Sequence, residues 1–149
     1  MNKEQTLILI RGLPGSGKTT KAFDLCNKDP DLVHLEADMF HCDLEGKYNY
    51  KDELSSLAHQ WCLSSTALYL NRGKSVVVSN TFITAKEMEP YFRMAKLMDV
   101  NVQIMACHGD FDSVHNVPRH VINYMKARLQ PQHKILAKYT EILIDKEVF

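Results

Sequence analysis

The chain has 149 residues, 45% of them hydrophobic, which is enough for a substantial core, and we expect one domain over residues 1–149. Its 18 Lys and Arg balance its 18 Asp and Glu, which argues against a protein that coats nucleic acid without sequence preference but leaves a local basic groove open. The longest apolar run, LILI, is far shorter than the roughly 20 residues of a membrane span and the start carries no signal-peptide pattern, so we expect a cytoplasmic protein without membrane contact.

The first predicted elements are a buried strand over residues 6–11 and a helix over residues 19–27, joined by a glycine-rich stretch, RGLPGSGKTT at 11–20. This stretch matches the pattern G-x-x-x-x-G-K-[ST], in which glycines let the backbone bend tightly and turn consecutive N–H groups toward phosphates. We therefore expect ATP here, with Mg²⁺ on the Thr19 hydroxyl. The alternative is an accidental glycine-rich turn. The candidate nucleotide-binding residues are Gly12, Pro14, Gly15, Ser16, Gly17, Lys18, Thr19 and Thr20.

Further apolar, β-branched segments alternate with helical patterns along the rest of the chain. The segments lie at 32–35, 75–78 and 100–106. Such alternation favours an α/β fold, a P-loop NTPase or kinase with a parallel sheet of four to five strands and helices on both faces. Residues 51–72 form the longest predicted helix, ended by Gly73 at the C′ position. Its expected inner face, with Trp61 in the core, consists of Leu54, Leu57, Ala58, Trp61, Ser65 and Leu68.

Two more helices and one ambiguous segment follow. A further helix is expected to start after Thr84, because Thr84 and Glu87 have capping-box spacing, although Pro90 is expected to open its main run. Met88, Phe92 and Ala95 are expected to face inward. A last clear helix is expected from Pro118 at N1 to Leu129, stopped by Pro131, with Val121, Ile122, Met125 and Leu129 on one face. The stretch EILI at 141–144 reads either as a fifth strand or as part of a terminal helix.

Two carboxylates follow the second strand, in HLEADMFHCD. The carboxyl ends of parallel strands meet at one edge of a sheet, so Glu36 and Asp38 are expected beside the phosphate loop. Asp38 is placed to take the proton of an acceptor hydroxyl during phosphoryl transfer; the alternative is a helix cap. Glu36 either reaches the magnesium shell through water or is a solvated strand end.

The third strand ends in VVVSNTF without the Walker-B carboxylate that helps to hold magnesium in many P-loop enzymes. Asn80 and Thr81 either position a substrate or are ordinary turn residues. On the last clear helix, Arg119, Lys126 and Arg128 form a cationic strip that is either a lid over ATP or a solvated face.

Cysteines and histidines show no metal-binding spacing. The cysteines lack C-x-x-C spacing and a paired pattern, so we expect a reducing compartment, inert thiols and no zinc; they are Cys26, Cys42, Cys62 and Cys107. Most histidines are expected to be surface or hydrogen-bonded residues, namely His34, His41, His59, His108, His120 and His133.

Four segments in this order resemble the polynucleotide-kinase-like P-loop family, which includes the 5′-OH kinase domain of bacteriophage polynucleotide kinase and small ATP-binding proteins of animals and phages. The segments are RGLPGSGKTT, HLEADMFHCDLEGKYNY, VVVSNTFITAKEMEPY and HNVPRHVINYMKAR, and the likeness covers roughly residues 6–130. The resemblance implies a 5′-hydroxyl nucleic-acid kinase fold, with Lys18 and Thr19 on the ATP phosphates and magnesium and Asp38 as the base. Asn80 falls where this family has Asp or Asn on the acceptor side.

Two departures from the family pattern matter. His41 stands where the bacteriophage kinase has an arginine that grips the acceptor phosphate. Relatives often carry an arginine shortly before the H-G-V-P of their lid, whereas DSVHNVP has Asp112 in that neighbourhood and His115 in the histidine position. Losing a transition-state arginine can cost on the order of 10³ to 10⁵ in rate. Arg119 and Arg128 are the candidate replacements; without one, the protein turns ATP over slowly or not at all.

The leading interpretation is an ATP-dependent phosphotransferase that moves the γ-phosphoryl group to a hydroxyl, most of all the 5′-OH of a nucleic acid or nucleotide. The balanced charge mildly supports a small-molecule acceptor instead. A third interpretation, an ATP-binding switch or interaction module, draws on Asp112 and the missing Walker-B carboxylate. No protein partner is identified. The catalytic candidates are Lys18, Asp38, Arg119 and Arg128, and the substrate candidates are Glu36, His41, Asn80, Thr81 and His115.

Overall fold

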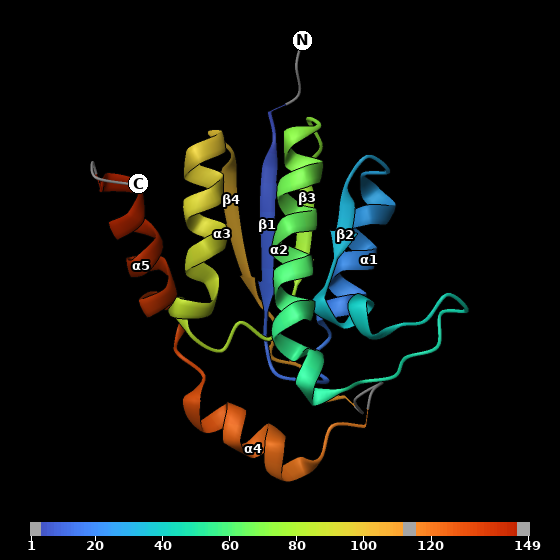
Figure 1. Ribbon diagram of the computed structural model, residues 1–149. Helices are drawn as coiled ribbons and strands as arrows, with labels where there is room; N and C mark the ends of the chain where they lie inside the picture. Colours follow the sequence, from blue (N-terminus) through green and yellow to red (C-terminus); the bar gives the residue numbers. More distant parts are fainter. Residues whose placement is uncertain (1–3, 112–115, 146–149) are drawn as a thin grey trace.

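The computed structural model describes residues 4–111 and 116–145, so Asp112 and His115 lie outside the described residues. Strands and helices alternate along the chain, with two short 3₁₀ helices before the second α-helix (Figure 1). The elements are β1 (Thr6–Arg11), α1 (Lys18–Lys28), β2 (Val33–Leu35), η1 (Ala37–His41), η2 (Asp52–Leu54), α2 (Ser55–Asn71), β3 (Val76–Ser79), α3 (Ala85–Met98), β4 (Asn101–Ala106), α4 (Arg119–Arg128) and α5 (Gln132–Ile144).

The four strands form one parallel sheet in the order β2-β3-β1-β4. In the register, Leu7 pairs with Val76 of β3 and with Val102 of β4. The central position of β1 follows from its sequence, because Leu7 to Arg11 are all buried and a strand in the middle of a parallel sheet is covered on both faces. The predicted α/β class with a parallel sheet is confirmed, with four strands.

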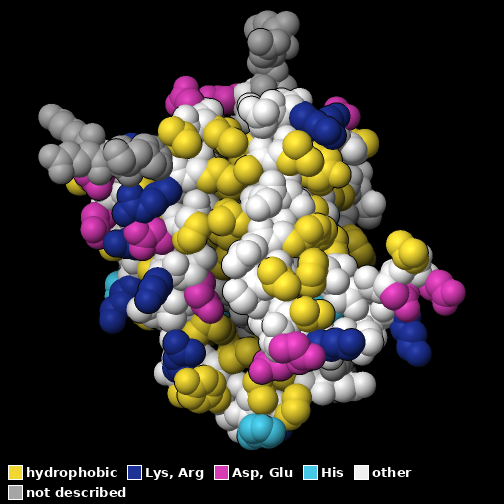
Figure 2. Space-filling view, in the orientation of Figure 1, with side chains coloured by type: hydrophobic (Ala, Val, Ile, Leu, Met, Phe, Trp, Pro, Cys, Tyr) yellow, Lys and Arg dark blue, Asp and Glu magenta, His cyan; other side chains and the backbone are white. Residues whose placement is uncertain are grey.

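Helices cover both faces of this sheet, as predicted. On one face, α1 packs through Ala22 against Ile8, Ile10 and Val77. On the other face lie α2 and α3, and α5 packs along the outside of α3, where the ring of Tyr139 contacts that of Phe92 at 5.0 Å between centroids (Figure 1). Hydrophobic side chains remain visible from top to bottom over the α2 and α3 side (Figure 2).

The predicted start of α3 after Thr84 is confirmed, but the role expected of Pro90 is wrong. The helix begins at Ala85 behind a complete capping box of Thr84 and Glu87, and Pro90 lies inside it and does not open it. A proline in the second turn removes a single backbone hydrogen bond, which the capping box and the burial of Met88 and Phe92 offset. The inward face predicted for Met88, Phe92 and Ala95 is confirmed.

Two helix ends and the inner face of α2 also differ from the prediction. Pro118 is the N-cap of α4 and not its first residue. The stretch EILI at 141–144 is helical and ends α5, so the strand alternative is wrong. In α2, Leu57 and Leu68 are about half exposed, because the buried positions recur every fourth residue; they are Ala58, Cys62, Thr66 and Leu70. Trp61 packs against the core, as predicted, and Gly73 has the positive φ of a C′ glycine, 83°.

All four strands point their carboxyl ends to the same edge of the sheet, the lower one in Figure 1. The connections that leave this edge carry the glycine-rich loop, η1 and the residues after β3, and α4 crosses below them. No helix in the described parts of the chain is long and apolar enough to cross a membrane.

Candidate active site

The glycine-rich loop between β1 and α1 has the backbone that its sequence predicts. Gly15 and Gly17 adopt φ angles of 79° and 95°, which strain any residue with a Cβ, and Gly17 is the N-cap of α1. A Cβ on Gly12 would lie 2.6 Å from the carbonyl oxygen of Cys107, so only glycine fits where these two segments meet. Ser16 Oγ is buried without a hydrogen-bond partner among the described residues. The loop is a cradle with an unused polar atom at a helix N-terminus, which suits phosphate oxygens.

Lys18 supplies the positive charge of this cradle. Its Nζ donates a hydrogen bond of 2.9 Å to the carbonyl oxygen of Leu13. Burial lowers the pKa of Lys18, and the negative potential of Glu36 and Asp38 opposes that shift. Lys18 and both carboxylates therefore belong to one electrostatic cluster, as their places after β1 and β2 predicted.

Glu36 lies directly against the first turn of α1. The Thr19 hydroxyl donates to both of its carboxylate oxygens, at 3.2 and 3.3 Å. The pKa of Glu36 is raised to about 7, above all by burial and also by the neighbouring Asp38, while the Thr19 hydrogen bond and Lys18 act to lower it. His34 Nε2 is 3.3 Å from Glu36 Oε1, and burial lowers the pKa of His34, which favours its neutral form over an ion pair with Glu36. The side chain of Glu36 is only 15% exposed, so the alternative of a solvated strand end is wrong.

Asp38 lies in η1 next to an aromatic side chain. Tyr48 donates a hydrogen bond of 3.4 Å to Asp38 Oδ1, and burial together with the Asp38 carboxylate raises the pKa of Tyr48. The N-cap of η1 is Glu36, and no side chain makes a cap hydrogen bond there. Asp38 therefore does not cap η1, which removes that part of the helix-cap alternative.

Asn80 and Thr81 connect these segments. Asn80 is 7% exposed; its Oδ1 accepts a 2.9 Å hydrogen bond from the backbone N–H of Ala37, and its Nδ2 faces the sulfur of Cys62 at 3.7 Å. The carbonyl oxygen of Thr81 accepts a hydrogen bond from Gly12 N–H at 3.1 Å. Asn80 thus holds the start of η1, and with it Asp38, against β3, and Thr81 holds the entrance of the glycine-rich loop.

His41, a substrate candidate, is buried. It is 6% exposed, and its Nδ1 has no hydrogen-bond partner among the described residues. Its ring is 4.8 Å from that of Tyr50 and 6.1 Å from that of Tyr48, between centroids, and Phe40 lies on another side at 5.9 Å. His41 is therefore a buried residue among three aromatic rings, of which that of Tyr50 is about half exposed.

Two cavities are lined by residues that follow the strands of the sheet. One of about 480 Å³ lies on the α1 side, lined by Ser16, Gly17, Thr20, Lys21, Asp24, Cys107, His108, Gly109 and Phe111. The segment after β4 closes it, because Gly109 N–H and Phe111 N–H donate to the carbonyl oxygens of Ser16 and Gly15. Sequence reasoning did not select Phe111 or Gly109, since no local motif marks a strand end that folds over a distant loop.

The other cavity, about 330 Å³, opens between α2 and α3 at the end of β3. Most of its lining area is apolar, and the polar groups come from both helices; the residues are Ser56, His59, Gln60, Leu63, Asn80, Thr81, Phe82, Glu87, Pro90 and Tyr91. Asn80 and Thr81, two of the substrate candidates, therefore line this cavity.

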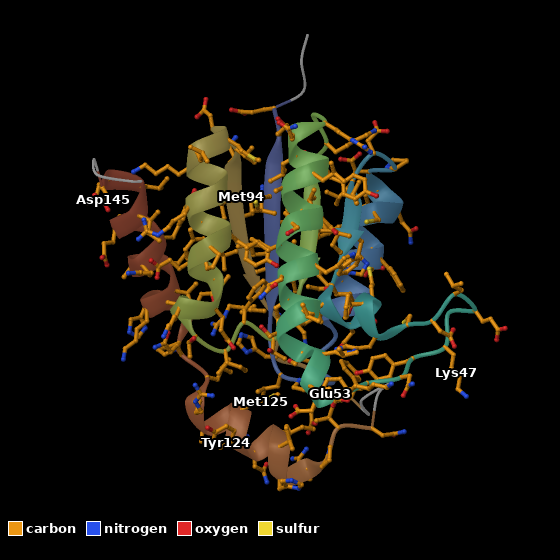
Figure 3. All side chains as sticks on the ribbon, viewed as in Figure 1. Lys47, Glu53, Met94, Tyr124, Met125 and Asp145 are labelled. Carbon is orange, nitrogen blue, oxygen red and sulfur yellow. The ribbon has the colours of Figure 1, made fainter. Side chains whose placement is uncertain are left out.

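The cationic residues of α4 are exposed. Arg119 and Lys126 face solvent, and the guanidinium of Arg128 lies over the ring of Tyr124 at 5.3 Å. The predicted apolar face, Val121, Ile122, Met125 and Leu129, is half-buried, and no residue of α4 is fully buried. Figure 3 labels Tyr124 and Met125 on this helix, below the sheet edge.

Arg11 is a residue that sequence reasoning missed. It is 3% exposed, and its Nε donates to the carbonyl oxygen of Phe82 at 3.0 Å. Its other nitrogens donate to the carbonyl oxygens of Ile83 and Gln130 and to Gln132 Oε1, at 3.3, 2.8 and 3.1 Å. Arg11 therefore ties the last residue of β1 to the connection between α4 and α5. Its partners are up to 121 residues away, so no local pattern indicates them.

The described residues contain no group of three or more His, Cys, Asp or Glu side chains that could hold a metal ion by themselves. A divalent ion at this edge would take the Thr19 hydroxyl and the phosphate oxygens of a nucleotide as its ligands.

The thiols are not disulfide-bonded, and Cys42 is exposed where inert cysteines were expected.

A family model described as an AAA domain matches residues 7–114. The chain belongs to this AAA domain family. Human NEDD4-binding protein 2 is 31% identical over 91 residues, which are 60% of the chain but only 5% of that much longer protein. The uncharacterized protein PM0531 of Pasteurella multocida is 30% identical over 148 residues, 89% of the chain and 82% of that protein.

Solved structures similar to this AAA domain chain include kinases. The Pnkp1/Rnl/Hen1 RNA repair complex contains a chain with 17% identity and a TM-score of 0.59, matched over 100% of this chain and 47% of that one. The APS kinase CysC of Mycobacterium tuberculosis has 16% identity and a TM-score of 0.57, over 70% of this chain and 76% of that one, and has also been solved with AMPPNP and APS. At this identity the likeness shows a shared fold, that of P-loop kinases.

Proposed function

We propose that this AAA domain protein is an ATP-dependent phosphotransferase that moves the γ-phosphoryl group of ATP to the 5′-OH of a nucleic acid or nucleotide. One observation carries the proposal: the loop lysine, Lys18, and the carboxylate of Asp38 lie in one electrostatic cluster at the carboxyl edge of the sheet. A cation for the phosphates and a base for the acceptor hydroxyl are the two groups that phosphoryl transfer asks of the protein.

The nucleotide would occupy the cradle and the cavity beside it. The positive φ angles of Gly15 and Gly17 and the unpartnered Ser16 Oγ fit the phosphates, with Lys18 on the β- and γ-phosphates. The 480 Å³ cavity on the α1 side has room for the nucleoside, with the exposed ring of Phe111 at its border. The Thr19 hydroxyl would hold a Mg²⁺ ion, which would supply positive charge against the charge that develops on the phosphates.

The acceptor would approach from the side of η1. As the acceptor oxygen bonds to the γ-phosphorus, Asp38 takes its proton, and the bond from that phosphorus to the bridging oxygen breaks to release ADP. The 330 Å³ cavity beside Asn80 and Thr81 is apolar enough to take a flat ring such as a nucleobase, which supports a nucleoside-containing acceptor. The similar chain in an RNA repair complex supports the same class.

The exposed arginines of α4 complete the proposal. Arg119 and Arg128 are free to approach transferred phosphate if α4 closes as a lid, and the half-buried face of α4 supports a helix that packs loosely on the body.

A small-molecule kinase remains the second candidate, favoured by the balanced charge. Four thiols without disulfide bonds support a cytoplasmic location within this proposal.

The test is incubation with γ-labelled ATP and a panel of 5′-OH RNA, 5′-OH DNA and nucleosides, with wild type, Asp38→Asn and the exposed control Asp31→Asn. We expect label on a 5′-OH acceptor, and loss of about 10² to 10⁴ in rate for Asp38→Asn, because an amide keeps the size but cannot accept the proton. ATP affinity should hardly change, and Asp31→Asn should behave like wild type.

Two results would contradict parts of this proposal. Transfer retained within about threefold in Asp38→Asn would exclude Asp38 as the base, since general-base help is worth more than that. ATP binding without label on any acceptor would favour the switch or interaction module.

A further inference from the structure

The carboxyl end of β3 raises a question about how this chain holds magnesium. Where many P-loop enzymes have an aspartate that helps to hold Mg²⁺, β3 ends in Ser79 and Asn80. Asn80 is committed to Ala37 and Cys62, and the Ser79 hydroxyl lies 2.7 Å from His34 Nε2. Neither side chain brings a negative charge to the loop.

A carboxylate reaches the same place from the neighbouring strand. β2 pairs with β3 in parallel, and the chain continues from the last residue of β2, Leu35, into Glu36. Both carboxylate oxygens of Glu36 accept a hydrogen bond from the Thr19 hydroxyl, at 3.2 and 3.3 Å. Thr19 is the loop hydroxyl that the motif assigns to the metal.

Glu36 is also held in place from its other side. His34 Nε2 lies 3.3 Å from Glu36 Oε1 and 2.7 Å from Ser79 Oγ, so a row of three side chains, Ser79, His34 and Glu36, leads from β3 across β2 toward Thr19 of α1. The side chains of His34 and Glu36 are 8% and 15% exposed. A carboxylate so enclosed loses hydration, and the row that fixes its orientation compensates in part.

We propose that Glu36 is the positioning residue of the Mg²⁺ site and does from β2 what an aspartate at the end of β3 does in other P-loop proteins. By accepting the proton of the Thr19 hydroxyl, Glu36 leaves the lone pairs of Thr19 Oγ1 for the metal and places a negative charge beside it. His34 and Ser79 orient Glu36 from behind. This inference rests on the proposed binding of Mg²⁺ and nucleotide, but not on the acceptor or on phosphoryl transfer.

The consequence is a specific change in the metal dependence of nucleotide binding. Groups that orient a metal ligand typically contribute 10- to 100-fold to metal affinity. Without metal, Glu36 opposes the nucleotide phosphates through its negative charge, so its removal should leave ADP binding unchanged or make it tighter. A residue that only supports the fold would weaken binding equally with and without Mg²⁺.

The experiment is calorimetric titration of ADP with millimolar Mg²⁺ and with EDTA. The readout is the Kd measured in EDTA divided by the Kd measured with Mg²⁺. The variants are Glu36→Gln and Glu36→Ala, with Thr19→Ala as the variant that lacks the metal-binding hydroxyl. Glu45→Gln makes the same chemical change at an exposed position of the loop after η1. We expect the ratio to fall about 10- to 100-fold in both Glu36 variants and in Thr19→Ala, and to stay at the wild-type value in Glu45→Gln.

Glu36→Asp keeps the charge on a shorter side chain and should recover part of the ratio. Melting curves of each variant without nucleotide show that the comparison concerns folded protein. If the ratio of the ADP dissociation constants in Glu36→Gln and Glu36→Ala stays within about threefold of the wild-type ratio, the role inferred for Glu36 is wrong. The proposed binding of Mg²⁺ and nucleotide is not affected by that result. If wild type itself binds ADP equally with and without Mg²⁺, the proposed magnesium dependence fails, and the role of Glu36 fails with it.

Discussion

Glu36 and Asp38 are two residues apart, yet their surroundings differ. Glu36 is enclosed by Thr19 and His34, and burial raises its pKa to about 7. Asp38 is half-buried in η1, where a tyrosine hydroxyl donates to it. Neighbouring carboxylates in unlike environments can serve unlike purposes, and here one would orient a metal ligand while the other takes a proton.

The raised pKa of Glu36 predicts how its contribution to stability depends on pH. An unfolded glutamate titrates near its ordinary value of 4.5, whereas Glu36 in the folded protein titrates near 7. The folded state therefore binds the proton more tightly, so this contribution is present below about pH 4.5 and is lost as pH rises to about 7. A separation of this size corresponds to about 3 kcal/mol at most.

Urea denaturation between pH 4.5 and pH 8, in EDTA and without nucleotide, measures this effect. Glu36→Gln cannot titrate, so relative to wild type it should gain up to about 3 kcal/mol of unfolding free energy as pH rises across that range. Glu45→Gln should follow wild type. Parallel curves for Glu36→Gln and wild type would show that the Glu36 carboxylate is not destabilised by burial.

Which of these residues the sequence could identify depends on how local their signals are. Lys18 and Thr19 belong to a motif whose spacing already implies the loop geometry. The closeness of Glu36 to the glycine-rich loop, and so to Thr19, could be predicted because parallel strands have their carboxyl ends at one edge of the sheet. The role of Asn80 could not be read, because its partner is the backbone of Ala37, 43 residues away.

At the level of elements, Arg11 links the glycine-rich loop to the lid candidate α4. Its guanidinium reaches Phe82 and Ile83 on one side and the α4–α5 connection on the other. Phe82 has a φ of 43°, which is strained for a residue with a large side chain, and the hydrogen bond from Arg11 helps to fix that conformation. Gln130 adds to the junction, because its Oε1 accepts from Ala85 N–H at 2.7 Å.

Arg11→Met should therefore destabilise the protein by roughly 2–4 kcal/mol, because several buried carbonyl oxygens lose their donor at once. Arg11→Lys keeps the charge but reaches fewer of these acceptors, so it should fall between wild type and Met. Arg93→Met is the control, since Arg93 makes a half-exposed pair with Glu89 within one helix, worth about 0.3–0.5 kcal/mol.

Urea denaturation of the three variants decides the point. A loss in Arg11→Met no larger than that in Arg93→Met would mean that the Arg11 hydrogen bonds contribute nothing measurable to stability.

The prediction of elements succeeded where periodicity and turn residues agreed and failed where one residue was given too much weight. Pro90 was expected to open the main run of α3, although the capping box of Thr84 and Glu87, which lies before it, was the stronger signal. EILI was ambiguous because a short apolar run fits a strand or a buried helix turn equally well. Its helical state follows from packing, since Ile142 of α5 is buried against the rest of the core.

On the scale of the whole molecule, the positive charges near the carboxyl edge are few and spread out. Lys47 lies in the loop that projects from the body after η1, and Arg119 lies on α4 (Figures 1 and 3). Lys51 is exposed just before η2. With no net charge on the chain, a bound nucleic acid would contact only the phosphates next to its 5′ end.

The affinity for a single-stranded 5′-OH oligonucleotide should therefore depend weakly on salt. Two to four phosphate contacts, at roughly 0.7 per contact, give a slope of about −1.4 to −2.8 in a plot of log affinity against log salt. Arg119→Ala should reduce that slope by about 0.7 if Arg119 is one of the contacts, whereas Lys74→Ala, exposed at the opposite edge just before β3, should not change it. Fluorescence anisotropy at five or so salt concentrations measures all three proteins. A slope near zero would favour a small acceptor of low charge, and a slope equivalent to six or more contacts would contradict a short local groove.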